Sequence, residues 1–223
     1  MRLLIAAVVW VGAVAGAVAL SSAVASSIHN PPSQTASAGS GSATGGTGAP
    51  SPGSAGSSSV DPSSITSTDP RSLFRTVNFT KALATVRSHI GAGAKLDLLA
   101  LYPGYMSLTQ VVGGSERDVY IAFDGAYMLE NTGGSAGGSP VFALSRVAAT
   151  VPAALAARIA TAGHTPVSQL NYMVAQVDPA DNRFRWLVYP HQGNRVEYYE
   201  ASGATGPLLE YLTNSSTGLQ PVR

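Results

Sequence analysis

The sequence predicts an α+β fold of two tandem α-β-β-β repeats, in which antiparallel sheets are each covered by a short helix. Apolar and polar residues alternate in several short runs, which is the period of strands with one buried face. Before each group of runs, apolar residues recur at helical spacing. The two groups align without a gap at an offset of 72 residues, which matches Leu83 with Leu155 and Leu98 with Leu170. An N-terminal membrane segment and a disordered linker are expected before the repeats.

Residues 1–25 are predicted to enter a membrane. Leu3 to Leu20 carry no charge and follow the basic start Met1-Arg2. Extended to Ala25, this run gives roughly 34 Å of helix, enough for a hydrocarbon core of about 30 Å. We favour an uncleaved single-pass anchor in a bacterial cell membrane. The C-terminal part is expected outside the cytoplasm, because no Lys or Arg follows the N-terminal charge before Arg71. The alternative is a signal peptide cleaved after Ala25, which would secrete the chain.

Residues 26–68 are predicted to be a disordered linker. They are nearly all Ser, Gly, Ala, Thr and Pro, and such a segment has too little apolar side chain to offset the entropy lost on ordering. A flexible chain of this length has an r.m.s. reach of roughly 35 Å. The linker would therefore hold a folded head away from the bilayer.

The first repeat is placed at residues 69–138. Phe79, Leu83, Val86 and Ile90 form one helical stripe, with Asn78 as the expected cap and glycines ending the helix. Four alternating runs follow, at residues 96–102, 105–112, 119–123 and 127–131.

The second repeat is placed at residues 139–213. Its helical stripe holds Val151, Leu155 and Ile159, with Thr150 as cap and Pro152 in the first turn, where proline is tolerated. Residues 169–201 read as a three-stranded meander, broken at 178–182 and 190–194 by residues typical of turns. A short helix is expected over 208–212, and residues 214–223 are expected to be a frayed tail.

One run in the second repeat combines tryptophan, tyrosine, valine and a single glycine: Trp186, Val188, Tyr189, Gly193, Val196 and Tyr198. This run resembles PepSY-like domains of bacterial exported proteins. More distantly, the tandem arrangement is similar to the repeats of the beta-lactamase inhibitor protein. The match covers Arg71 to Leu212 at the level of pattern. The resemblance implies an extracytoplasmic binding or inhibitory module, and it supplies no catalytic residues.

Several functional classes find no support in the composition. The chain has no cysteine, which excludes disulfides and thiolate chemistry. A formal net charge of +1 gives no support for nucleic-acid binding. No G-x-S-x-G motif is present, and no two of the four histidines stand at metal-ligand spacing on one element. Asp178 and Asp181 bracket a proline, so turn capping is a better interpretation than acid–base chemistry. We therefore predict no catalytic, metal or cofactor site.

Aromatic and arginine side chains supply the remaining candidate. Alternation predicts that Phe184, Trp186 and Val188 face the helix, which leaves the neighbouring residues on the open face of the sheet. Tyr and Arg are enriched in protein-binding faces; the alternative is that these residues form core and cross-strand pairs. The predicted binding face consists of Arg183, Arg185, Tyr189, Arg195 and Tyr199.

The predicted function is a non-enzymatic extracytoplasmic binding or sensor module, tethered to the bacterial membrane through its N-terminal segment. Its expected partner is a protein or another envelope ligand. The alternative is an envelope hydrolase or metal-dependent enzyme whose site is not evident from the sequence.

Overall fold

The computed structural model describes residues 60–130, 134–213 and 218–222. The predicted anchor and most of the predicted linker lie outside these ranges. Among the described residues, no helix is both long enough and apolar enough to cross a membrane.

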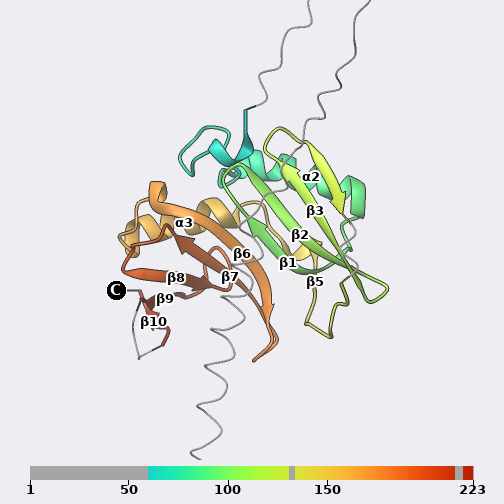
Figure 1. The fold of residues 1–223 in the computed structure, drawn as a ribbon. Coiled ribbons are helices and arrows are strands. Elements are labelled where there is room, and N and C mark those ends of the chain that lie inside the picture. Colours follow the sequence, from blue (N-terminus) through green and yellow to red (C-terminus); the bar gives the residue numbers. More distant parts are fainter. Residues whose placement is uncertain (1–59, 131–133, 214–217, 223) are drawn as a thin grey trace, which may run out of the picture. The chain divides into compact units, whose positions relative to one another are not determined.

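The described part of the chain builds one sheet and two α-helices, which confirms an α+β fold with antiparallel pairing (Figure 1). The strand order is β10-β9-β8-β7-β6-β1-β2-β3-β4, and β5 pairs with β1 beside this path. In chain order the elements are η1 (Pro62–Ser64), α2 (Thr76–Ile90), β1 (Lys95–Leu101), β2 (Tyr105–Val112), β3 (Ser115–Ala122), β4 (Tyr127–Glu130), β5 (Phe142–Ala143), η2 (Leu144–Arg146), α3 (Val151–Ala162), η3 (Val167–Gln169), β6 (Leu170–Asp178), β7 (Arg183–Pro190), β8 (Val196–Ala201), β9 (Leu208–Leu212) and β10 (Gln220–Pro221).

The centre of the sheet is the antiparallel pair β1–β6. Leu99 lies opposite Ala175, and Leu101 lies opposite Met173. The first half, α2 with β1–β4, and the second half, α3 with β6–β9, therefore share one continuous sheet rather than two. Each helix is followed by four neighbouring strands. The four runs predicted for the first half correspond to β1–β4, whereas the second half has β9 in addition to the three strands predicted.

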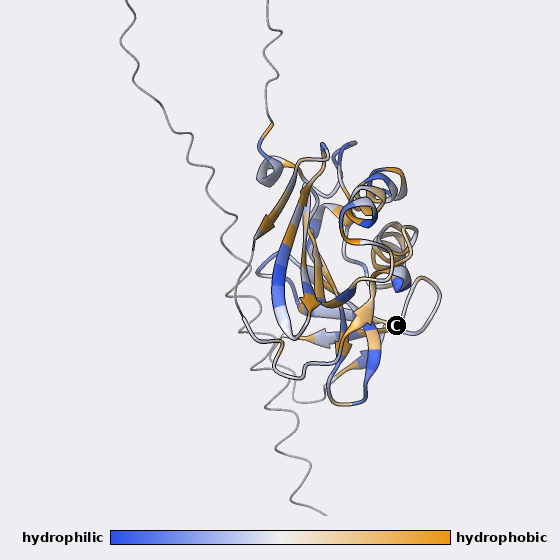
Figure 2. Cartoon of the chain, turned by 90° about the vertical axis from the view of Figure 1, so that its right-hand side faces the viewer, coloured by the Kyte–Doolittle hydropathy of each residue, from blue (hydrophilic) through white to orange (hydrophobic). Residues whose placement is uncertain are grey.

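Both α-helices lie on one face of the sheet (Figure 2). Between the helices and the sheet lies the main core, to which α2 contributes Phe79 and Leu83 and α3 contributes Leu155. Trp186 and Tyr199 are the largest fully buried side chains of this core. The predicted orientation of β7 is confirmed, since Phe184, Trp186 and Val188 belong to this core or pack against it. Each helix is too short to be stable alone, so the sheet holds it in place.

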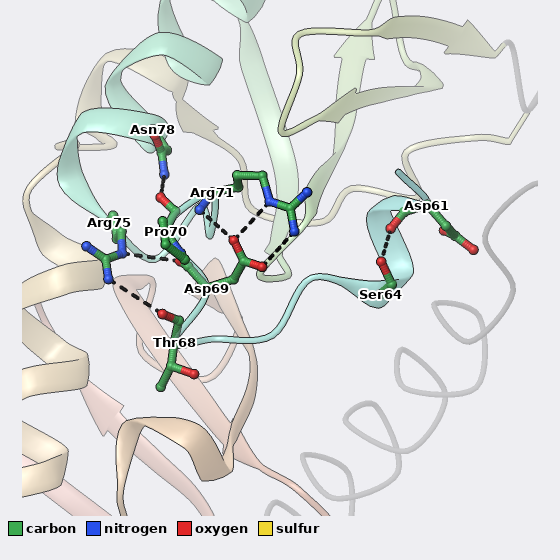
Figure 3. Close-up of polar contacts among 8 residues, drawn as sticks. All are labelled: Asp61, Ser64, Thr68, Asp69, Pro70, Arg71, Arg75 and Asn78. Atoms are coloured by element: carbon green, nitrogen blue, oxygen red, sulfur yellow. Dashed lines mark hydrogen bonds and ion pairs between the residues drawn. The ribbon is translucent and has the colours of Figure 1, made fainter. Parts of the chain in front are cut away.

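The entry to α2 differs from the prediction. The helix begins at Thr76, and Asn78 lies inside its first turn, so Asn78 is not the cap. Its amide Nδ2 instead donates to Pro70 O at 2.8 Å (Figure 3). The same group donates to Ser72 O at 3.0 Å, and the two bonds fix the preceding loop. In the same loop, Asp69 accepts hydrogen bonds from the backbone and the guanidinium of Arg71.

Residues before Asp69, the predicted start of the first repeat, already belong to the fold. Ile65 is buried, and Ser67 Oγ donates to Val167 O at 2.7 Å. A Cβ atom added to Gly104 would lie 1.8 Å from Pro62 O, so the η1 segment sits directly on the β1–β2 turn. The end of the predicted linker is therefore part of the fold, because Ile65 is buried in it.

The C-terminal prediction was wrong in two respects. Residues 208–212 form strand β9 instead of a helix, and their burial alternates as expected of an edge region. Leu208 packs into the main core, whereas Tyr211 pairs with Tyr198 on the opposite face. Backbone groups of β8 would otherwise lack partners on this side, and β9 supplies them. The expected frayed tail includes β10, which pairs with β9.

Candidate functional site

The face of the sheet opposite the helices carries a continuous row of stacked tyrosines, which we call the tyrosine ladder. Seven of the nine tyrosines in the sequence belong to it. Neighbouring ring centroids are 4.4 to 5.7 Å apart. In spatial order its members are Tyr120 (β3), Tyr105 (β2), Tyr102 (after β1), Tyr172 (β6), Tyr189 (β7), Tyr198 (β8) and Tyr211 (β9).

The register of the sheet explains the ladder. Six neighbouring strands each contribute one tyrosine to the open face, and the residue directly after β1 contributes the seventh. The central contact, between Tyr102 and Tyr172 at 5.2 Å, crosses the β1–β6 junction. Six steps at about 4.8 Å between strands give a ladder of about 29 Å. The row therefore exists only because the two halves share one sheet.

A small apolar floor supports the middle of the ladder. Tyr172, Val174 and Leu187 are buried there, and Tyr102, Tyr189 and Tyr198 pack against them. This second cluster is separate from the main core under the helices. Most ladder rings are consequently half-buried, with one edge on the floor and the other toward the outside.

Burial sets the protonation state of the ladder. It raises the pKa of Tyr120 to about 12, with smaller contributions from the nearby Tyr105, Asp61 and Asp124. Burial also raises the pKa of Tyr198 to about 12, assisted by Glu200. These phenols therefore remain neutral at physiological pH and keep a hydroxyl that can donate a hydrogen bond. Because most ring faces are stacked on one another, the outer surface offers ring edges and hydroxyl groups.

Next to the ladder, one arginine is surrounded by three carboxylates, which we call the Arg185 cluster. The guanidinium of Arg185 contacts Asp181 and Glu200 directly and lies 3.4 Å from Asp178 Oδ2. Burial raises the pKa of Glu200, although the facing guanidinium opposes this effect. Asp178 and Asp181 also cap the β6–β7 turn, through bonds from Ala180 N and Arg183 N. The predicted turn-capping role of these two aspartates is confirmed.

The structure divides the predicted binding face. Arg185 and Tyr189 lie together on the open face, in the Arg185 cluster and the ladder respectively. The side chain of Arg183 is 80% exposed and lies 3.8 Å from Asp181. Arg195 is exposed in the bend before β8. The guanidinium of Arg185 is fully engaged within the chain and is not available to a partner's carboxylates as expected.

Tyr199 was wrongly assigned to the binding face. It is fully buried under α3, where its hydroxyl donates to Gly163 O at 3.0 Å and lies 2.7 Å from Thr165 Oγ1. Consecutive strand residues face opposite sides, so only one of Tyr198 and Tyr199 can lie on the open face. The β8–β9 pairing is irregular between Val196 and Tyr198. Because of this irregularity, Tyr199 rather than Tyr198 faces the main core together with Val196.

Other parts of the described chain offer weaker candidates. His89 stacks on Tyr127, with ring centroids 3.9 Å apart, and this pair lies away from the ladder. An open groove beside α3 contains Arg158, whose guanidinium already donates to Ala204 O and Gly206 O. Within the described ranges, no three acidic, histidine or cysteine side chains gather in a way that could hold a metal ion.

Comparison with models of known protein families, with curated proteins and with solved structures finds no match for this chain. Any assignment of function therefore rests on the arrangement of residues in the structure alone.

Proposed function

We propose that this chain is a non-enzymatic binding module that presents the open face of its sheet to a protein or envelope ligand outside the cytoplasm. The observation that carries the proposal is the tyrosine ladder. Tyrosine gives a large contact area with a polar group at its end, and it loses little conformational entropy on binding. Stacking further restricts the rings before a partner arrives, which lowers the entropic penalty of association.

The size of the ladder suits a protein partner. A standard interface buries about 800 Å² on each side, which corresponds to a patch roughly 28 Å across. The ladder spans about 29 Å. It also crosses both halves of the sheet, so a single partner can contact both.

We further propose that the two halves are repeats of one unit, and that the N-terminal segment tethers them to the membrane. The matched element order, the central β1–β6 pair and the equivalent core positions of Leu83 and Leu155 support the duplication. The PepSY-like resemblance belongs to the same proposal. The apolar run Leu3 to Leu20 supports the tether.

The test compares partner capture by ladder variants of the full chain. Tyr105→Ala/Tyr189→Ala removes two half-buried rings from the ladder, whereas Tyr127→Ala removes the same side chain from the pair with His89. We expect pull-downs from envelope extract to lose specific partners with the ladder variant and to keep them with Tyr127→Ala. Thermal melts establish that both variants are folded. Unchanged capture by a folded ladder variant would contradict the proposal.

A further inference from the structure

The helix layer of the molecule contains no carboxylate at all. Residues 70–94, which include α2, and residues 139–169, which include η2 and α3, contain six Arg and Lys residues and no Asp or Glu. The remaining sequence holds all 12 carboxylates. The charged residues of the helix layer are thus all cations, although the formal net charge of the chain is only +1. The cations of the helix layer are Arg71, Arg75, Lys81, Arg87, Arg146 and Arg158.

These cations are largely uncompensated within the described chain. Only Arg71 forms a salt bridge, with Asp69 at 2.8 Å. Arg75, Arg87 and Arg158 donate to backbone carbonyls, which leaves their charge in place. The guanidinium of Arg146 lies 4.9 Å from the centre of the Phe184 ring. A neutral acceptor does not cancel a positive charge, so the helix layer presents a cationic surface.

The opposite face has the reverse character. There the ladder is flanked by the Arg185 cluster, in which carboxylates outnumber guanidiniums. Both helices lie on one face of the sheet (Figure 2), and the ladder belongs to the cluster on the other face. A surface that attracts the helix layer therefore leaves the ladder pointing away from it.

We infer that the helix layer docks on an anionic lipid surface, which orients the head with its tyrosine ladder turned away from the bilayer. The inference favours a bilayer over a soluble polyanion because the same sequence carries the apolar run Leu3 to Leu20, which would bring the head to a membrane. Each Lys or Arg near an anionic bilayer contributes roughly a fivefold change in partition. A few cations suffice when a tether already holds the head close.

The absence of cysteine permits a direct test with single labels on the full chain. Ser88→Cys places a fluorophore on α2, where Ser88 is exposed, and Ser107→Cys places one on β2 beside the ladder. Each labelled protein is mixed with vesicles of phosphatidylglycerol and phosphatidylcholine, or of phosphatidylcholine alone, that contain a nitroxide-headgroup quencher. We expect quenching at position 88 only, in the anionic vesicles only, and its loss in 1 M salt, where the screening length falls to about 3 Å.

A charge variant sharpens the test. Lys81→Gln/Arg146→Gln removes two cations from the helix layer, and it should lower the ratio of docked to undocked head about 30-fold. Arg183→Gln/Arg195→Gln removes the same charge from exposed sites at the sheet and serves as the matched control, with little expected effect.

Three results would overturn the inference. Equal quenching at positions 88 and 107 would show that the head has no preferred face. Equal quenching in neutral and anionic vesicles would exclude an electrostatic cause. Absent quenching in vesicles, together with co-sedimentation on polyphosphate beads, would assign the helix layer to a soluble polyanion instead. None of these results affects capture of a partner by the ladder, which the pull-down measures separately.

Discussion

Tyr198 and Tyr199 are neighbours in β8, yet they serve opposite faces of the sheet. Tyr199 is fully buried under α3, and its hydroxyl has partners at Gly163 and Thr165. Tyr198 is half-buried, stacks on Tyr211 and contacts the tilted ring of Tyr189. The same residue type therefore stabilises the core on one face and forms a contact surface on the other. Exposure and hydrogen bonding, rather than residue identity, separate the two roles.

The faces also differ in what holds them together. On the helix side, Trp186, Phe79 and many aliphatic side chains form one large core. On the open side the buried apolar cluster is small and consists of Tyr172, Val174 and Leu187. Stability should thus depend mainly on the helix side, and binding on the open side. Each of the following predictions tests this division.

The largest effect is expected at Trp186. Truncating a buried aromatic residue to alanine costs about 3–5 kcal/mol, a large part of the roughly 5–15 kcal/mol that stabilises a domain. Trp186→Ala should therefore unfold or severely destabilise the chain. Tyr105→Ala, on the half-buried ladder, should lower the free energy of unfolding by much less. Thermal and urea melts measure both, and equal losses would show that the open face also carries the fold.

A smaller effect is expected from one hydroxyl group. Tyr199→Phe leaves Gly163 O and Thr165 Oγ1 without their buried partner, which should destabilise the fold by about 1–3 kcal/mol. Tyr198→Phe is the matched control, because its hydroxyl lies on the open face, and it should change stability by no more than about 0.5 kcal/mol. A Tyr198 effect as large as that of Tyr199 would remove the distinction between the faces.

Tyrosines of the ladder should ionise at a higher pH than tyrosines of an unfolded chain. Burial raises the pKa of Tyr120 and Tyr198 to about 12, above the value of about 10 for an unfolded chain. A raised pKa favours the neutral phenol in the fold, so this stabilisation is complete below pH 10 and is lost as the pH rises toward 12. Absorbance of phenolate near 295 nm should appear together with unfolding. Ionisation of all tyrosines near pH 10 in the folded chain would contradict burial of the ladder.

The smallest effect is expected at Asp97 on β1. Burial, followed by repulsion from Glu116, raises the pKa of its carboxyl group. The fold therefore disfavours the charged form, and this penalty disappears as the pH falls below about 4. Asp97→Asn should slightly stabilise the chain at pH 7, and the difference should vanish at pH 3. Urea melts at the two pH values check this, and destabilisation at pH 7 would indicate a partner for the charged carboxylate.

Local patterns in the sequence predict much of this architecture. Alternation places Trp186 and Tyr189 on the correct faces, and helical stripes locate α2 and α3, because both depend on short-range periodicity. The pairing of β1 with β6 depends on contacts between strands far apart in the chain, which no local pattern specifies. The complete ladder therefore could not be predicted. Tyr211 was expected in a helix over 208–212, since a short run rich in leucine fits either a helix or a strand.

The β1–β6 seam also determines how the chain tolerates being divided. A fragment that ends near residue 138 would keep α2 and β1–β4 but would lose the strand that pairs with most of β1. An open strand edge with apolar neighbours readily recruits another strand. Because β1 and β6 are antiparallel, a second copy of β1 can take the vacant place with the same polarity. The isolated first half should therefore be a homodimer by size-exclusion chromatography.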